Sequence, residues 1–139
     1  MDYKEYAGLY PALNIDEFIN VLHPNSGNPF VNLIQANIRI REMWSMIYAQ
    51  ADGDFPHPIF PAAGGLFPWA YNDDNGYYFW KTGGDPSSWT VVVVESLQWW
   101  EHPGGFGDFL SGWTAGTVVS PVLEEGVSGP DYSVRRISE

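Results

Sequence analysis

Residues 66–81 decide the fold, and they read LFPWAYNDDNGYYFWK. The sequence changes to β character from residue 64, and residues 66–71 are the first predicted strand, in which Pro68 indicates an edge position or a bulge. Residues 73–76 form a predicted hairpin turn, because the pair Asn75-Gly76 accepts the positive φ angles that tight hairpins need. Residues 77–81 then return as a second, antiparallel strand.

The same β character continues toward the C-terminus. We expect a third strand over residues 89–95, and Val91 to Val94 are apolar on both faces, which predicts a central strand covered on both sides. A fourth strand is expected over residues 97–101. A short closing helix is expected over residues 108–114, where apolar residues recur at helical spacing. Residues 124–139 are polar and contain Gly and Pro, so we expect a loose tail.

The N-terminal part predicts helices. Asn14 can cap a helix over residues 14–23, with Glu17 three positions later as in a capping box. A second helix is expected from Asn28-Pro29 to residue 51, with a break near residues 35–38 because Asn37 interrupts its apolar stripe. The chain is therefore predicted to be one α+β domain over residues 1–123, with N-terminal helices packed on an antiparallel β-meander of four or more strands and a short closing helix.

Aromatic residues are abundant, with 7 Trp, 8 Tyr and 8 Phe in 139 residues. Neighbours in a strand point to opposite faces of the sheet. Trp99 and Trp100 are therefore expected on different faces, as are Phe79 and Trp80. Most of these rings belong in a core, whereas an exposed Trp or Tyr ringed by carboxylates would resemble a protein-binding hot spot.

The formal net charge is −11, and Lys81 is the one basic residue among eleven acidic ones between residues 51 and 134. Such a surface repels nucleic-acid phosphates and anionic lipids, so neither is an expected partner. It would attract a basic protein, although acidity also serves solubility alone.

Catalytic and metal motifs are absent from the sequence. The lack of cysteine excludes disulfides and thiolate chemistry. His23, His57 and His102 are scattered and each precedes a proline, so we expect turn or surface histidines, no metal and no cofactor. Asp73 to Gly76 resembles a calcium loop, but Tyr71 would occupy its first ligand position, which favours the hairpin. A pair of carboxylates meeting in space, as in a small hydrolase, stays open as an alternative.

Several segments together resemble the SUKH superfamily of fungal cell-wall-synthesis regulators and bacterial immunity proteins. They are, in order, GGLFPWA at residues 64–70, NGYYFW at 75–80, GDP at 84–86, WTVVV at 89–93, WE at 100–101 and FGDFL at 106–110. The resemblance implies a non-catalytic α+β domain that binds partner proteins. In bacterial relatives the partner is often a toxin of nuclease or deaminase type, which implies a basic toxin domain as the partner here.

Asp73, Asp74 and Asp85 are the predicted partner contacts, with Trp80 and Trp100 as aromatic anchors. A housekeeping regulatory or scaffold protein of the same fold, without a toxin, is the alternative. The N-terminal sequence MDYKEYAGLY lacks the apolar stretch of a signal peptide, and the longest apolar run is four valines, so we expect a cytoplasmic protein.

Overall fold

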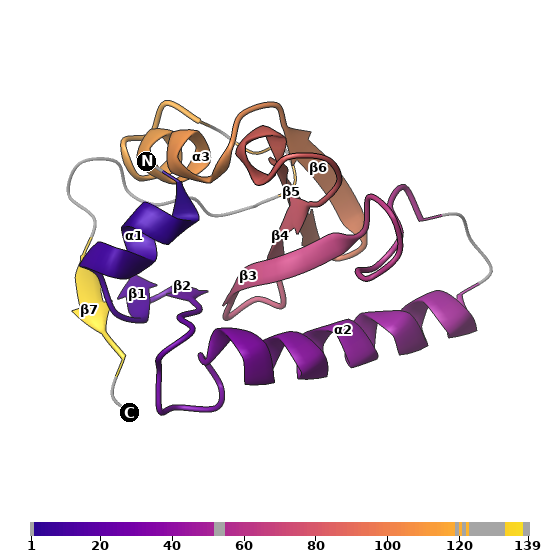
Figure 1. Cartoon of the computed structure of the whole chain (residues 1–139), viewed down its shortest axis with the longest axis horizontal. Coiled ribbons are helices and arrows are strands. Elements are labelled where there is room, and N and C mark those ends of the chain that lie inside the picture. Colours follow the sequence, from indigo (N-terminus) through magenta and orange to yellow (C-terminus); the bar gives the residue numbers. More distant parts are fainter. Residues whose placement is uncertain (1, 52–54, 119, 121, 123–132, 138–139) are drawn as a thin grey trace.

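A computed structural model describes residues 2–51, 55–118, 120, 122 and 133–137. Over these residues seven strands form one sheet in the order β6-β5-β4-β3-β2-β1-β7, and every neighbouring pair is antiparallel (Figure 1). The helices are α1 (Tyr3–Leu9), α2 (Leu33–Gln50) and α3 (Phe106–Thr114), with a 3-10 turn η1 at Pro86–Ser88. The strands are β1 (Leu13–Ile15), β2 (Ile19–Val21), β3 (Leu66–Asn72), β4 (Tyr77–Lys81), β5 (Thr90–Glu95), β6 (Gln98–His102) and β7 (Val134–Arg136).

The sheet is covered on both faces, which confirms the predicted α+β class. Helix α2 lies along one face, and α1 and α3 lie on the other (Figure 1). Side chains of β4 alternate between them, with Phe79 packed on the α2 side and Trp80 on the α1 and α3 side. Trp99 and Trp100 divide in the same way, as the period of a strand predicts.

The predicted helix over residues 14–23 is wrong, because β1 and β2 form a hairpin there. Asp16 and Glu17 both have φ of 56° and make the turn, with the Phe18 N–H donating to the Ile15 carbonyl. Strand β2 pairs onward with β3, Val21 lying opposite Ala70. The local residues allow either a helix start or a hairpin, and this long-range pairing selects the hairpin.

Helix α2 begins later than predicted, at Leu33, where the Asn32 side chain accepts hydrogen bonds from the Ile34 and Gln35 N–H groups. The predicted break near residues 35–38 is wrong. Asn37 is buried under the sheet, donates to the Pro68 carbonyl at 2.7 Å and accepts from Arg41 Nε at 2.7 Å. The helix therefore stays continuous because its polar interruption has partners in the core.

The strands predicted from residue 66 onward are confirmed to within a residue or two. Pro68 lies at a register shift between β3 and β4, so the bulge reading is the correct one for this interior strand. Val91 to Val94 are fully buried, as expected, and β5 lies next to the edge strand β6 rather than at the centre of the sheet. Helix α3 begins two residues earlier than predicted.

Both ends of the described chain add elements that the sequence analysis does not predict. Asp2 caps α1 by accepting from the Glu5 N–H at 2.8 Å. The predicted tail is wrong for residues 134–136, because β7 pairs with β1 and places Val134 opposite Ile15. Residues 124–132 and 138–139 of the predicted tail lie outside the described residues. No helix in the described ranges is long and apolar enough to cross a membrane.

Candidate functional site

A pocket of about 520 Å³ lies between the start of α1, the loop after β4 and the start of α3. Its walls are aromatic, and carboxylates surround them, so it is called the acid-rimmed pocket below. The aromatic residues are Tyr3, Trp80, Trp89 and Phe106, and the carboxylates belong to Asp2, Asp85 and Asp108. Lys4 is the one basic residue that the described part of the chain contributes to the lining.

The aromatic wall is assembled from three distant segments. The alternation of β4 directs Trp80 to this face of the sheet, where the Tyr3 ring meets it edge-on with ring centroids 4.8 Å apart. Trp89, just before β5, lies 6.2 Å from Trp80, and Phe106 of α3 lies 5.2 Å from Tyr3. The buried Trp89 Nε1 has no hydrogen-bond partner among the described residues.

Backbone and side-chain groups fix the position of each rim carboxylate. Asp2 caps α1, and Asp85 caps η1 by accepting from the Ser87 N–H at 2.9 Å. Asp108, in the first turn of α3, accepts from His102 at 2.8 Å. Because their acceptor geometry is set by local structure, the three charges are preorganised around the aromatic wall.

Asp85 remains ionised over a wide pH range. Hydrogen bonds from the Ser87 backbone N–H and from the Ser87 hydroxyl lower the pKa of Asp85 below its usual value. The pKa of Glu101 on β6 is also lowered. Burial raises this pKa, but the hydrogen bonds from Thr90 and Lys81 have the larger combined effect. Lowered carboxyl pKa values suit charge recognition and do not suit proton donation.

The predicted contact residues are divided among three places. Asp85 and Trp80 both line the acid-rimmed pocket. Asp73 and Asp74 are exposed in the β3–β4 turn, at the opposite end of β4 from Asp85. Trp100 is half-buried on β6 against Phe109 of α3, with ring centroids 6.4 Å apart, and does not line the pocket. The five residues therefore do not form one cluster.

Trp80 is not the exposed anchor that the sequence analysis predicts. The residue is only 7% exposed, because Tyr3 and Phe106 pack over it. It contributes a wall of the pocket, and Trp89, which is half-buried, offers more of its ring to a partner.

Sequence reasoning missed four of the residues that shape this pocket, namely Asp2, Tyr3, Trp89 and Phe106, as well as the rim residue Asp108. One signal was present: Asp2 and Glu5 have the spacing of a capping box, which would have predicted α1. The convergence of Trp89 and Phe106 has no local signal, since it depends on how α3 docks on the sheet.

Among the described residues no group of three or more His, Cys, Asp or Glu side chains could hold a metal ion. Comparison with known proteins finds no matching family model, no matching curated protein and no matching solved structure.

Proposed function

We propose that this chain is a protein-binding domain that acts as an immunity protein: it binds a basic toxin domain of nuclease or deaminase type and blocks it stoichiometrically. The observation that carries the proposal is the acid-rimmed pocket, in which preorganised carboxylates surround an aromatic wall. The net charge of −11 and the resemblance of residues 64–110 to the SUKH superfamily support it.

The pocket matches the chemistry of a lysine or arginine side chain. A cation over the face of Trp89 would gain about 0.5–2 kcal/mol from the ring quadrupole, depending on how far it is desolvated. The carboxylates of Asp85 and Asp108 would hold its charge at the rim. A toxin that cleaves or modifies nucleic acid carries such cations in its substrate cleft, and an acidic inhibitor associates with it quickly through long-range attraction.

Coexpression provides the test. The product of the adjacent reading frame is expressed in a bacterial host with and without this chain, and viable counts are measured. We expect the chain to restore growth and to form a one-to-one complex with the purified product. Growth inhibition that the chain does not relieve would contradict the proposal.

A charge-matched pair of variants ties the effect to the pocket. Asp2→Asn with Asp85→Asn removes two rim charges and keeps both caps, because Asn caps helices about as well as Asp. Glu17→Gln with Glu42→Gln removes two exposed charges elsewhere and serves as the control. We expect protection to weaken in the first variant and to persist in the second. Equal protection by both variants would place the interface on another surface.

A further inference from the structure

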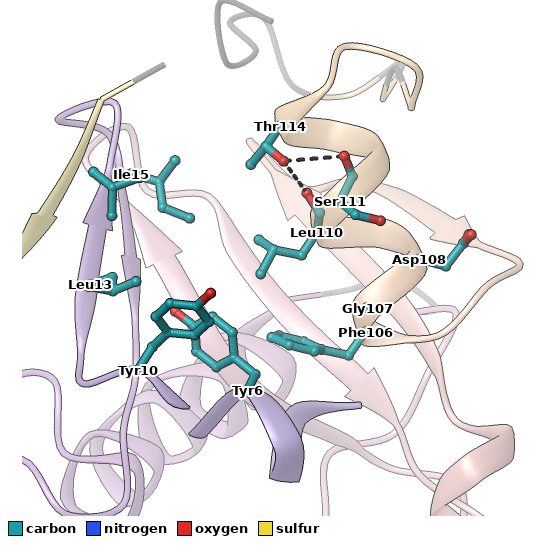
Figure 2. Close-up of a pocket in the computed structure, with 11 residues that line it drawn as sticks. Tyr6, Tyr10, Leu13, Ile15, Phe106, Gly107, Asp108, Leu110, Ser111 and Thr114 are labelled. Atoms are coloured by element: carbon teal, nitrogen blue, oxygen red, sulfur yellow. Dashed lines mark hydrogen bonds between the residues drawn. The ribbon is translucent and has the colours of Figure 1, made fainter. Parts of the chain in front are cut away.

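A second pocket, of about 680 Å³, lies on the other side of the α3 start, between α1, β1 and α3 (Figure 2). It is called the tyrosine groove here. Leu13 and Ile15 line it from β1, and Leu110 faces them from α3. Tyr6 of α1 and Tyr10, the residue after α1, extend side by side into the space between (Figure 2). The volume lies within the range of sites that enclose small organic ligands.

Two polar side chains of the groove, Thr114 and Asp108, have hydrogen-bond partners. The Thr114 hydroxyl donates to the Leu110 and Ser111 carbonyls, and Asp108 accepts from His102. The Tyr6 hydroxyl is different, because it is buried and has no hydrogen-bond partner among the described residues. Tyr6 as a whole is only 4% exposed. A buried donor without an acceptor is unfavourable in the free protein and is satisfied when a ligand supplies the acceptor.

The Tyr6 phenol remains protonated, because burial and the neighbouring Tyr10 raise the pKa of its hydroxyl far above neutral pH. It is therefore a neutral hydrogen-bond donor. Tyr10, whose ring centroid lies 5.3 Å from that of Tyr6, is 45% exposed. Exposed side chains change rotamer within nanoseconds, so Tyr10 can turn aside and open the Tyr6 hydroxyl to a ligand.

We propose that the tyrosine groove binds a neutral, mainly apolar small molecule that carries one hydrogen-bond acceptor, such as a medium-chain ketone, with its chain between β1 and α3 and its acceptor on the Tyr6 hydroxyl. A neutral ligand fits better than an anionic one, because the Asp108 carboxylate also lines the groove. This inference does not depend on the proposed function.

Fluorescence titration tests the proposal with two defined probes. Diphenylhexatriene is a hydrocarbon without an acceptor, and it fluoresces when it enters an apolar site. We expect the full chain to bind it saturably at one site, and 2-decanone to displace it. Absence of saturable binding to the wild-type chain would overturn the proposal.

Two substitutions locate the ligand. Ser111→Trp places an indole into the groove from an exposed helix position, and it should abolish diphenylhexatriene binding. Gln35→Trp, exposed on α2 across the sheet, is the matched control and should bind as the wild type does. Equal binding by both variants would exclude the groove.

Tyr6→Phe tests the hydrogen bond separately from the fold. It removes only the unpartnered hydroxyl, so the free protein should keep or gain thermal stability, and its affinity for diphenylhexatriene should be unchanged. Its affinity for 2-decanone should fall about fivefold, the effect of one neutral hydrogen bond. Equal displacement by 2-decanone from both proteins would refute the role assigned to Tyr6.

Discussion

His102 Nε2 donates a hydrogen bond to Asp108 Oδ2 at 2.8 Å and so ties the end of β6 to the first turn of α3. The imidazole is buried and the carboxylate is largely exposed. The segment held in this way, Phe106 to Asp108, lines the acid-rimmed pocket on one side and the tyrosine groove on the other. One hydrogen bond therefore positions the wall that the acid-rimmed pocket and the tyrosine groove share.

Substitution of Gly104 should break this contact. A Cβ atom at position 104 would meet Asp108 Oδ2 and His102 Nε2, the latter at 2.8 Å, so the two side chains would have to separate. Because the exposed Asp108 side chain can move aside, we expect Gly104→Ala to lower the free energy of unfolding by only about 1 kcal/mol in urea denaturation. The cost should shrink when Asp108→Ala is already present, since the shared contact is then gone. Additive costs in the double variant would show that Gly104 acts independently of the pair.

Gly65 is required for close packing and Gly8 is not. A Cβ atom on Gly65 would clash with the Phe60 backbone nitrogen and lie 2.6 Å from the Ile59 carbonyl carbon, neither of which can move cheaply. Gly65→Ala should therefore cost about 3 kcal/mol or more. Gly8 has open space around it within α1, so Gly8→Ala should stabilise by about 0.5–1 kcal/mol. Thermal unfolding of the two variants measures the expected loss of stability for Gly65→Ala and the expected gain for Gly8→Ala. A Gly65→Ala variant as stable as the wild type would contradict the close packing around Gly65.

The β5–β6 hairpin contains residues that suit its turn poorly. Ser96 and Leu97 adopt φ of 51° and 61° in a two-residue loop, and Leu97 is 56% exposed. Asn-Gly is the pair that such a turn favours. Replacing Ser96-Leu97 by Asn-Gly should raise the free energy of unfolding by about 1 kcal/mol without loss of core packing. The reverse order, Gly-Asn, serves as a comparison, and a decrease in stability of the Asn-Gly variant would count against the turn assignment.

Stability should fall as the pH drops through the histidine range. Burial lowers the pKa of His57 from its ordinary value of 6.5, and Lys81 lowers it further while Glu101 opposes. The unfolded chain therefore takes up a proton at a higher pH than the folded chain, so the free energy of unfolding decreases below pH 6.5 until folded His57 is also protonated. Urea denaturation across this range should show a shallower slope for His57→Gln than for the wild type. Identical slopes would assign the pH dependence to other groups.

Affinity for the proposed basic toxin domain should depend on salt through the rim charges. Raising the ionic strength screens exposed charges, so the complex of the wild-type chain should weaken as salt increases. The variant with Asp2→Asn and Asp85→Asn should bind more weakly at low salt and lose less of its affinity as salt rises. Isothermal titration at several salt concentrations measures both effects, and parallel salt dependences for the two proteins would argue against rim contact.

Local sequence was sufficient for the elements whose signals agree with one another. Residues 66–81 hold two apolar and aromatic segments on either side of Asn75-Gly76, and the structure forms β3, the turn and β4 there. The side-chain period also assigned Phe79 and Trp80 to opposite faces, because a strand leaves no other arrangement. The apolar stripe likewise predicted α2, although its interruption at Asn37 led to a predicted break that the helix does not have.

Where local signals compete or are missing, only the tertiary structure determined which element forms and which residues become neighbours. Asn14 to Glu17 suit either a helix start or a turn, and the pairing of β1 with β7 and of β2 with β3 selected the turn. Trp80 is buried in the wall of the acid-rimmed pocket and is not an exposed anchor, because Tyr3, near the N-terminus, packs over it. Both pockets lie where α1 and α3 meet the sheet, and no local pattern encodes such a junction, since its residues become neighbours only when long-range burial brings the elements together.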